Sequence, residues 1–249
     1  MTHDPSLDSF RRRRLLFDAA SDFYYLQNHR YPRTASLDLV GNRYALPHAE
    51  RQLLHRGVFG QEAALARRAR RSAGAAWREK RLVVDGCNVQ ITVESGILQR
   101  KLLLANDGAM RDIAGQSAQF RMTEASEMAL DVIFRFLDEH RPKSVLFLYD
   151  APMSHSGALA DRVRRRLRAM GLPGDARTSP SPDSEMPLGD CVVASSDYAI
   201  LDKSTSWLDL ARQALDCAEV ARPFVSFESF VRSTPPEFHD WLRSGDEGF

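Results

Sequence analysis

The chain is poor in cysteine, and this argues against two kinds of architecture. Its 249 residues include only Cys87, Cys191 and Cys217, and no two of them are spaced as CxxC. Because three cysteines cannot all pair within one chain, we expect reduced, partly buried thiols. The sequence therefore predicts neither a disulfide framework nor a structural zinc site.

Long apolar runs are also missing from the sequence. No stretch approaches the ~20 apolar residues that a membrane-spanning helix needs. The first residues include Asp4, Asp8 and the arginines 11–14, with no apolar stretch of the signal-peptide kind behind them. We therefore expect a cytoplasmic protein that does not bind membranes.

Two signatures of enzymes that bind phosphate groups are absent after the first strand-like segment, residues 81–85. No GxGxxG follows it, which argues against a Rossmann dehydrogenase. A phosphatase of the haloacid dehalogenase type needs a second aspartate two residues after its nucleophile, and position 87 is cysteine. Both classes are therefore disfavoured.

The net charge of +1 hides an uneven distribution of charge. Residues 1–81 hold 16 Lys and Arg against 8 Asp and Glu, whereas the remainder holds 18 against 25. A basic first third joined to an acidic remainder is typical of an arm that attracts a polyanion and a part that holds cations. The same arginines are equally compatible with solvated helix faces or with ion pairs to the acidic part.

Composition and periodicity divide the chain into a basic α-helical domain, residues 1–76, and an α/β domain, residues 80–249. The first part has helical spacing of apolar residues, with a helix over 50–58 behind Pro47 and an Arg/Ala-rich helix from 63 that ends in a linker at 72–76. In the second part, we expect a strand from 81 to the Asp-Gly at 85–86 and further strands at 144–149, 175–179, 191–194 and 224–227. Helices are expected at 123–140, 157–170 and 207–217, and a hairpin at 102–113.

Strands that alternate with helices predict an α/β fold with a mostly parallel sheet and helices on both faces, preceded by the small α-helical domain. Functional groups gather at the carboxyl ends of the strands in such sheets. Asp85, Asp150 and Asp197 each follow a short apolar run, so we expect all three at one edge of the sheet. Each of them alone is also compatible with a residue that ends a strand or caps the next turn.

Further acidic residues precede or follow these strand ends. Asp183 lies at a predicted helix start, 14 residues before Asp197. Glu124, Glu127 and Asp131 fall on one line along their predicted helix. Clustered carboxylates repel one another unless a cation joins them, and hard divalent ions prefer oxygen ligands. The pattern predicts a site for Mg²⁺ or Mn²⁺, which activates water for phosphodiester cleavage.

The segment Val83-Val-Asp-Gly-Cys-Asn88 resembles the opening strand of PIN and NYN ribonuclease domains. Pro182-Asp-Ser-Glu185 and Val192-Val-Ala-Ser-Ser-Asp-Tyr198 are similar to the later acidic pair of that family. The resemblance covers residues 81–230. It implies a PIN-like nuclease domain in which Asp85, Asp183 and Asp197 bind the metal and Asn88 supports the first aspartate. Glu124 or Glu127 would match the family's helix glutamate, with Asp150 as a further catalytic candidate.

The whole chain resembles more closely an uncharacterised prokaryotic family that joins a small helical domain of unknown function to such a PIN-like module. Leu39-Val-Gly-Asn-Arg-Tyr44, Asp85-Gly-Cys-Asn-Val-Gln-Ile-Thr-Val-Glu94 and Asp150-Ala-Pro-Met-Ser-His-Ser-Gly157 carry this resemblance. The hairpin at 102–113 departs from a minimal PIN domain, and the sequence does not decide between the two glutamates.

Several polar residues are candidates for substrate binding. Ser154 and Ser156 precede a basic helix, and their hydroxyls suit either a phosphate or plain helix capping. That helix carries Arg162 and Arg165 among five arginines, which suit a nucleic-acid backbone or a solvated basic face. Asn88 and Ser196, next to the aspartates, complete the predicted set. Residues 42–44 (Asn-Arg-Tyr) suit contact with RNA or packing against the C-terminal domain.

These observations favour a metal-dependent hydrolase, a ribonuclease of the PIN-like type whose basic N-terminal domain guides RNA. The alternative is a non-catalytic PIN-like module that binds RNA or a protein. The sequence does not distinguish RNA from DNA, or endo- from exonuclease action. A homo-oligomer is compatible with it, and the oligomeric state is left open.

Overall fold

A computed structural model describes residues 5–113, 122–151, 153, 155–186 and 190–231 of the chain. The chain forms two compact units, and each is described by itself. The first comprises residues 1–66, 103–113 and 225–249, and the second comprises 67–102 and 114–224. No helix among the described residues is long and apolar enough to cross a membrane. The three cysteines are free, and two of them are buried, as expected.

The first unit is built on N-terminal helices, as predicted. Its elements are α1 (Pro5–Asn28), α2 (Arg33–Arg43), α3 (His48–Gly57) and the start of α4 (Gln61–Ala69). Helix α3 begins directly after Pro47, whose fixed φ suits a helix start. The Arg/Ala-rich helix α4 ends at Ala69, earlier than the sequence predicts. A core of buried Phe, Tyr, Leu and Val side chains from α1, α2 and α3 holds these helices together.

The predicted hairpin is confirmed, and it belongs to the first unit. Strands β2 (Leu102–Leu104) and β3 (Met110–Asp112) flank a turn in which Gly108 has φ +87°, a conformation that glycine adopts readily. Strand β7 (Phe224–Ser226) pairs with β2, which gives the order β3-β2-β7. The last predicted strand therefore exists, but it extends this second sheet instead of completing the parallel one.

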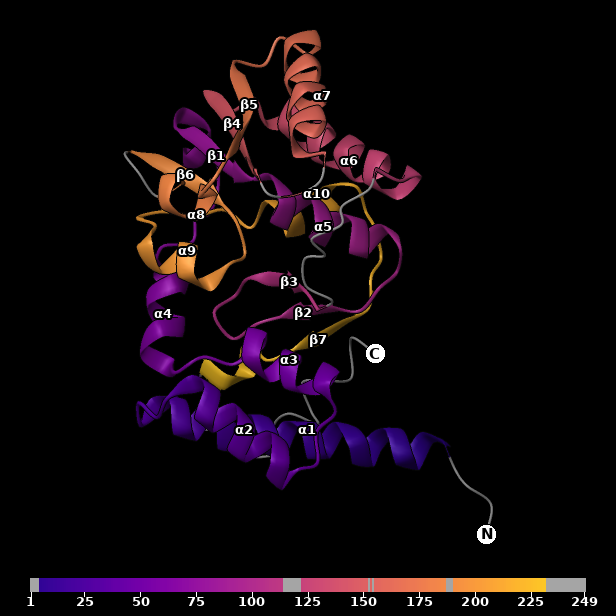
Figure 1. The fold of residues 1–249 in the computed structure, drawn as a ribbon, viewed down its shortest axis with the longest axis vertical. Helices are drawn as coiled ribbons and strands as arrows, with labels where there is room; N and C mark the ends of the chain where they lie inside the picture. Colours follow the sequence, from indigo (N-terminus) through magenta and orange to yellow (C-terminus); the bar gives the residue numbers. More distant parts are fainter. Residues whose placement is uncertain (1–4, 114–121, 152, 154, 187–189, 232–249) are drawn as a thin grey trace. The chain divides into compact units, whose positions relative to one another are not determined.

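The second unit is built around a parallel four-stranded sheet (Figure 1), which confirms the predicted α/β class. The strands are β1 (Arg81–Asp85), β4 (Ser144–Asp150), β5 (Gly174–Ser179) and β6 (Cys191–Ala194). Their order is β5-β4-β1-β6, and Asp85 stands opposite Leu148 in the β1–β4 register. Strands β4 and β5 follow β1 in the chain and lie in succession on one side of it, whereas β6 lies on the other side. The strand order therefore reverses between β1 and β6.

Helices cover both faces of this sheet. Phe147 and Tyr149 alternate with Leu146 and Leu148 along β4, so the two pairs point to opposite faces. The helical elements are η1 (Ala76–Glu79), α5 (Gly86–Ile97), α6 (Glu124–His140), α7 (Ser156–Ala169), α8 (Pro182–Glu185), α9 (Tyr198–Lys203), α10 (Leu210–Cys217) and, in the first unit, η2 (Glu228–Val231).

The two faces of the sheet pack against different helices. On one face, Val83, Leu146 and Leu148 pack with Met186 after α8 and Ile200 of α9. On the other, the ring of Phe147 stacks on that of Phe134 of α6 at 6.0 Å. Helix α5 starts immediately after β1, although the sequence gives no separate prediction of a helix there.

The segment that follows α4 is attached to the edge of the parallel sheet. Arg71 forms a parallel bridge to Trp207, which in turn bridges to Val193 of β6. The Ser72 amide donates to the carbonyl oxygen of Trp207 at 2.7 Å, and the Trp207 amide donates to that of Arg70 at 3.1 Å. Residues 70–72 thus extend the sheet next to β6. Helix α10 consequently begins at Leu210, later than the predicted position 207.

Candidate functional site

Two predicted aspartates flank the point at which the strand order reverses. Asp85 is the last residue of β1, and Asp197 follows β6 after two serines. Because β1 and β6 are hydrogen-bonded neighbours, their carboxyl ends meet at the same edge. The crevice at such a switch point is where open α/β sheets bind their ligands.

The Asp85 carboxylate is buried, with 7% of the residue exposed. It caps α5, since its Oδ1 accepts from the Asn88 amide at 3.1 Å, and its Oδ2 accepts from the Ser195 hydroxyl at 2.9 Å. The pKa of Asp85 is raised to about 7, chiefly by burial and to a smaller extent by the nearby Asp150 and Asp183 carboxylates, while the two hydrogen bonds act to lower it. A carboxyl group of this kind changes charge near neutral pH.

Ser195 joins Asp85 to Asp197. Its hydroxyl donates to Asp85, and its Oγ accepts from the Asp197 amide at 3.1 Å. The Asp197 carboxylate caps α9, because its Oδ1 accepts from the Ala199 amide at 2.7 Å. Serine at position 195 is a residue that the sequence does not single out, although it stands between the last strand and the predicted aspartate.

Asn88 and Ser196 form a second link between the same two elements. The Asn88 Oδ1 accepts from the Ser196 amide at 3.0 Å and from its hydroxyl at 2.8 Å. The first turn of α5 is thereby fixed to the segment that leads into α9. These groups hold the site together in this structure, and their predicted role in substrate binding stays a prediction.

Asp150 and Asp183 lie on the same side of the sheet as Asp85. Asp150 follows Leu148 by two residues, so it points to the face on which α8 and α9 pack. Burial raises the pKa of Asp150, and the Asp183 carboxylate raises it further. Burial also raises the pKa of Asp183, with a further rise from Asp197 that Lys203 opposes. Asp183 therefore interacts electrostatically with each of the other three predicted aspartates, and Asp85 also with Asp150.

The four aspartates offer carboxylate oxygens, which are the ligands that hard cations prefer. Among the residues that the structure describes, however, no three His, Cys, Asp or Glu side chains are grouped closely enough to hold a metal ion. Mg²⁺ is commonly bound by one or two carboxylates, with water and substrate phosphates completing its shell. The arrangement fits that mode better than a closed protein cage, and the metal set Asp85, Asp183 and Asp197 stays a prediction.

The two glutamates of α6 have different surroundings. The Glu127 carboxylate forms an ion pair with Arg162 of α7, at 2.6 Å between Oε2 and Nη2. One turn further along, Asp131 pairs with Arg166 at 2.5 Å. These pairs join α6 to α7, which run side by side (Figure 1). Glu127 and Arg162, predicted as catalytic and substrate-binding, are thus partners of each other.

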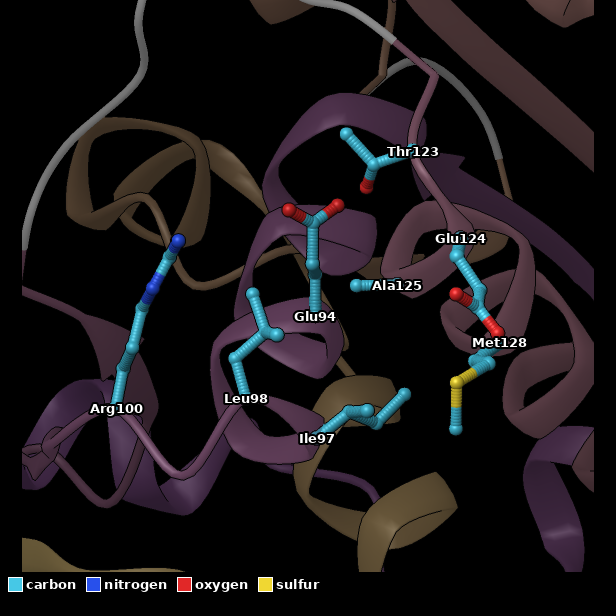
Figure 2. Close-up of a pocket in the computed structure, with 8 residues that line it drawn as sticks. All are labelled: Glu94, Ile97, Leu98, Arg100, Thr123, Glu124, Ala125 and Met128. Carbon is cyan, nitrogen blue, oxygen red and sulfur yellow. The ribbon is translucent and has the colours of Figure 1, made fainter.

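Glu124 faces an open pocket of about 600 Å³ between α5 and α6. Figure 2 shows Glu94 from α5 in the centre of this pocket, with Glu124 and Met128 from α6 on one side and Arg100 on the other. The Glu94 carboxylate accepts from the Ser126 hydroxyl at 2.7 Å. Glu94 is the last residue of the second motif that carries the family resemblance, and it was not predicted as a site residue.

The predicted phosphate-binding serines are only partly described. Ser154 lies outside the described residues. Ser156 is buried, and its hydroxyl donates to the Ala151 carbonyl oxygen at 3.4 Å. It therefore braces the start of α7 as a donor. The N-cap residue is His155, which makes no side-chain cap hydrogen bond, so Ser156 does not cap the helix in this structure.

The basic residues of α7 are largely engaged with carboxylates. Arg162 and Arg166 pair with α6, and Arg164 pairs with Asp161 at 2.5 Å and with Asp175 at 2.7 Å. Arg165 is exposed. Much of this face is therefore neutralised within the protein, and Arg165 is a more accessible candidate for contact with nucleic acid than Arg162.

The basic character of the helical unit is offset in the same way. Ion pairs among its described helices include Arg12–Glu50, Arg30–Glu62, Arg43–Asp22 and Arg51–Asp38. Residues 42–44 take part in this packing, since Tyr44 donates to Asp22 at 2.9 Å and Asn42 accepts from Arg51 at 2.9 Å. These hydrogen bonds lie within their own unit, and both the predicted packing against the C-terminal domain and the predicted contact with RNA stay predictions.

Gly86 allows α5 to lie against the end of β4. A Cβ atom at this position would meet Cε1 of Tyr149 at 2.4 Å. We expect Gly86→Ala to destabilise the protein by about 1–3 kcal/mol, because an added methyl group in a packed interior forces its neighbours apart. Thermal and urea unfolding would measure the loss.

The matched control for Gly86→Ala is Gly157→Ala in the first turn of α7. A Cβ there would have no heavy atom within 4 Å, and its φ is not positive. We expect this variant to be neutral or slightly more stable, by up to ~1 kcal/mol, since alanine favours helices. Equal effects of the two variants would show that the contact with Tyr149 is not close.

Comparisons with known proteins identify relatives whose descriptions state no function. Residues 75–213 match a domain of unknown function (DUF5616), and residues 15–70 match a protein of unknown function (DUF434). The chain is 26% identical over 199 residues to the uncharacterized protein MJ0935 of Methanocaldococcus jannaschii, a match that covers 80% of this chain and 95% of the relative. No solved structure matches the chain. The helical region and the α/β region thus correspond to two successive family segments.

Proposed function

The chain belongs to the DUF5616 family, and from its aspartates we propose that it hydrolyses phosphodiesters with a divalent metal ion, as a ribonuclease of the PIN-like type. The observation that carries the proposal is the pairing of Asp85 with Asp197 through Ser195 at the switch point of the parallel sheet. A ligand site is expected at that point on topological grounds alone. The resemblance of the strand-end motifs to PIN and NYN domains supports the same reading.

The electrostatics of the site favour a cation. At a pKa of about 7 the Asp85 carboxyl group is partly ionised at neutral pH, and a bound cation would lower that pKa and displace the remaining proton. Asp85 and Asp197 would hold Mg²⁺ or Mn²⁺, with Asp183 and Asp150 adding negative charge nearby. Such an ion lowers the pKa of a bound water and stabilises the negative charge that develops on phosphate.

The protein residues around the ion would have separate tasks. Ser195 and Asn88 keep the two aspartates in register by hydrogen bonds, so that little reorganisation is needed when substrate binds. Arg165 on α7 offers a positive charge to the backbone of a nucleic acid. RNA is the proposed substrate, and the N-terminal helices are the proposed guide for it.

The test is cleavage of labelled single-stranded RNA, and of DNA of the same sequence, by the full chain. We expect cleavage of RNA with Mg²⁺ or Mn²⁺ and none with EDTA, because EDTA removes the ion that activates water and stabilises the charge on phosphate. Product analysis by gel and mass spectrometry would report the position of the cut. Cleavage that survives EDTA, or no cleavage of either substrate with either ion, would contradict the proposal.

A second candidate is a non-catalytic module that binds RNA or a protein. It is favoured by the ion pair of Glu127 with Arg162, which occupies one of the two candidates for the family's helix glutamate. Fluorescence anisotropy with labelled RNA would distinguish the candidates. RNA binding that weakens steeply with salt, without cleavage, would favour the binding module.

A further inference from the structure

Arg67 is a buried cation in the segment that leads into the α/β unit. Only 3% of it is exposed, and it forms a two-pronged ion pair with Asp202 of α9. The distances are 2.7 Å from Nε to Oδ1 and 2.8 Å from Nη2 to Oδ2. Its guanidinium also lies over the ring of Tyr198, 5.4 Å from the centroid. One side chain thus contacts the first turn and the last turn of α9.

Arg70 holds the C-terminal end of the same helix. Its Nη1 donates to the carbonyl oxygen of Asp202 at 2.9 Å and to that of Ser204 at 2.8 Å. Such carbonyl groups at the end of a helix lack intrahelical partners, and a cationic donor stabilises them. Helix α9 has only six residues, and a helix of this length is not stable without tertiary contacts.

Helix α9 carries two charged groups of the aspartate site. Asp197 is its N-cap and accepts from the amides of Ala199 and Ile200. Lys203, in its last turn, opposes the rise that burial and the Asp197 carboxylate impose on the pKa of Asp183. The placement of α9 therefore decides where both charges stand relative to Asp183.

We propose that Arg67 and Arg70 are positioning residues of the aspartate site, which hold α9 so that Asp197 and Lys203 face Asp183. Arg67 and Arg70 lie in the segment matched by DUF434, whereas the aspartates lie in the segment matched by DUF5616. The first family segment thus supplies residues on which the site of the second depends. The expected effect on cleavage rests on the proposed function; the placement of α9 does not.

The experiment uses Arg67→Met in the full chain and follows amide hydrogen exchange, Mn²⁺ binding and RNA cleavage. We expect exchange at Ala199 and Ile200 to become roughly tenfold faster or more, because α9 opens locally. Affinity for Mn²⁺ alone should fall, and kcat/KM for RNA should fall about 10- to 100-fold as the carboxylate moves away from its productive position. Arg67→Lys, which keeps the charge but loses the two-pronged geometry, should lie between wild type and Arg67→Met.

Arg135→Met is the matched control, since it removes an exposed arginine that pairs with Glu139 within α6 at 3.2 Å. It should leave exchange in α9 unchanged. The proposal is overturned if Arg67→Met leaves the exchange of α9 as in the control, or if exchange rises equally at Val83 of β1. It is also overturned if α9 opens while Mn²⁺ affinity and cleavage persist in an otherwise active protein.

If Arg67→Met does not fold, Asp202→Asn replaces it, because the Asp202 side chain is 47% exposed and its change is milder. If the wild-type chain neither binds Mn²⁺ nor cleaves RNA, the proposed function fails. The exchange of Ala199 and Ile200 then still decides whether the two arginines hold α9.

Discussion

Asp85→Asn is expected to abolish cleavage and, at pH 8, to make the protein more stable than wild type. The folded protein binds the Asp85 proton more tightly than the unfolded chain does, because burial raises the pKa from 3.8 to about 7. Stability therefore falls as pH rises from about 4 to about 7 and stays at the lower level above that range. Asparagine has no charge to bury, so the variant avoids a cost of up to roughly 4 kcal/mol at pH 8.

Melting temperatures of wild type and Asp85→Asn between pH 4 and pH 8.5 measure this effect, in buffers without divalent ions. The gain of the variant should be greatest at pH 8 and vanish near pH 4. Asp175→Asn is a control for which we expect a change in stability of the opposite sign, since the hydrogen bond from Arg164 lowers the pKa of Asp175. The loss of that bond should lower stability slightly at pH 8. A variant of Asp85 that cleaves RNA normally, or melts lower than wild type at pH 8, contradicts the assignment.

Arg111→Met is expected to destabilise the first unit by about 3–5 kcal/mol, because it leaves the Asp107 carboxylate buried without its cation. The two side chains are 2% and 0% exposed and meet at 2.8 and 2.7 Å. The guanidinium also lies 5.1 Å from the ring centroid of Phe59. This pair sits in the β2–β3 hairpin, so its loss removes the support of that hairpin.

Urea unfolding, with hydrogen exchange in β2 and β3, measures the effect of Arg111→Met. The double variant Asp107→Leu with Arg111→Met should lose much less, since neither charge then remains in the interior. Arg135→Met, which breaks an exposed pair, should cost no more than about 1 kcal/mol. A loss of that small size for Arg111→Met would mean that solvent reaches the pair.

The sequence predicted the parallel sheet because three of its four strands are short, continuous apolar runs; the fourth, β5, is polar. Strands buried on both faces have this pattern, and the segments 81–85, 144–150 and 191–194 show it. The positions of Asp85, Asp150 and Asp197 at one edge followed from the same runs. Their hydrogen-bonded connection through Ser195 did not, because the local sequence does not show which serine hydroxyl points to which carboxylate.

Other features depend on contacts between distant parts of the chain. Residues 87–93 are rich in Val, Ile and Thr, which favour strands, yet Asp85 caps a helix there. The composition of 224–227 predicts a strand but not the sheet that it joins. Arg67 looks like one more solvated arginine, because its partner Asp202 lies 135 residues further along. Composition alone does not reveal this kind of burial.

The interrupted path of the chain has a consequence for synthesis on the ribosome. The helical unit begins at the N-terminus but includes residues 103–113 and a strand that ends at Ser226. All strands of the parallel sheet, by contrast, have been made once residue 194 has emerged. Domains fold as units when their segments become available. The helical unit, whose synthesis starts first, is therefore expected to complete its folding last. Part of its apolar core is expected to stay exposed on the nascent chain until β7 has been synthesised.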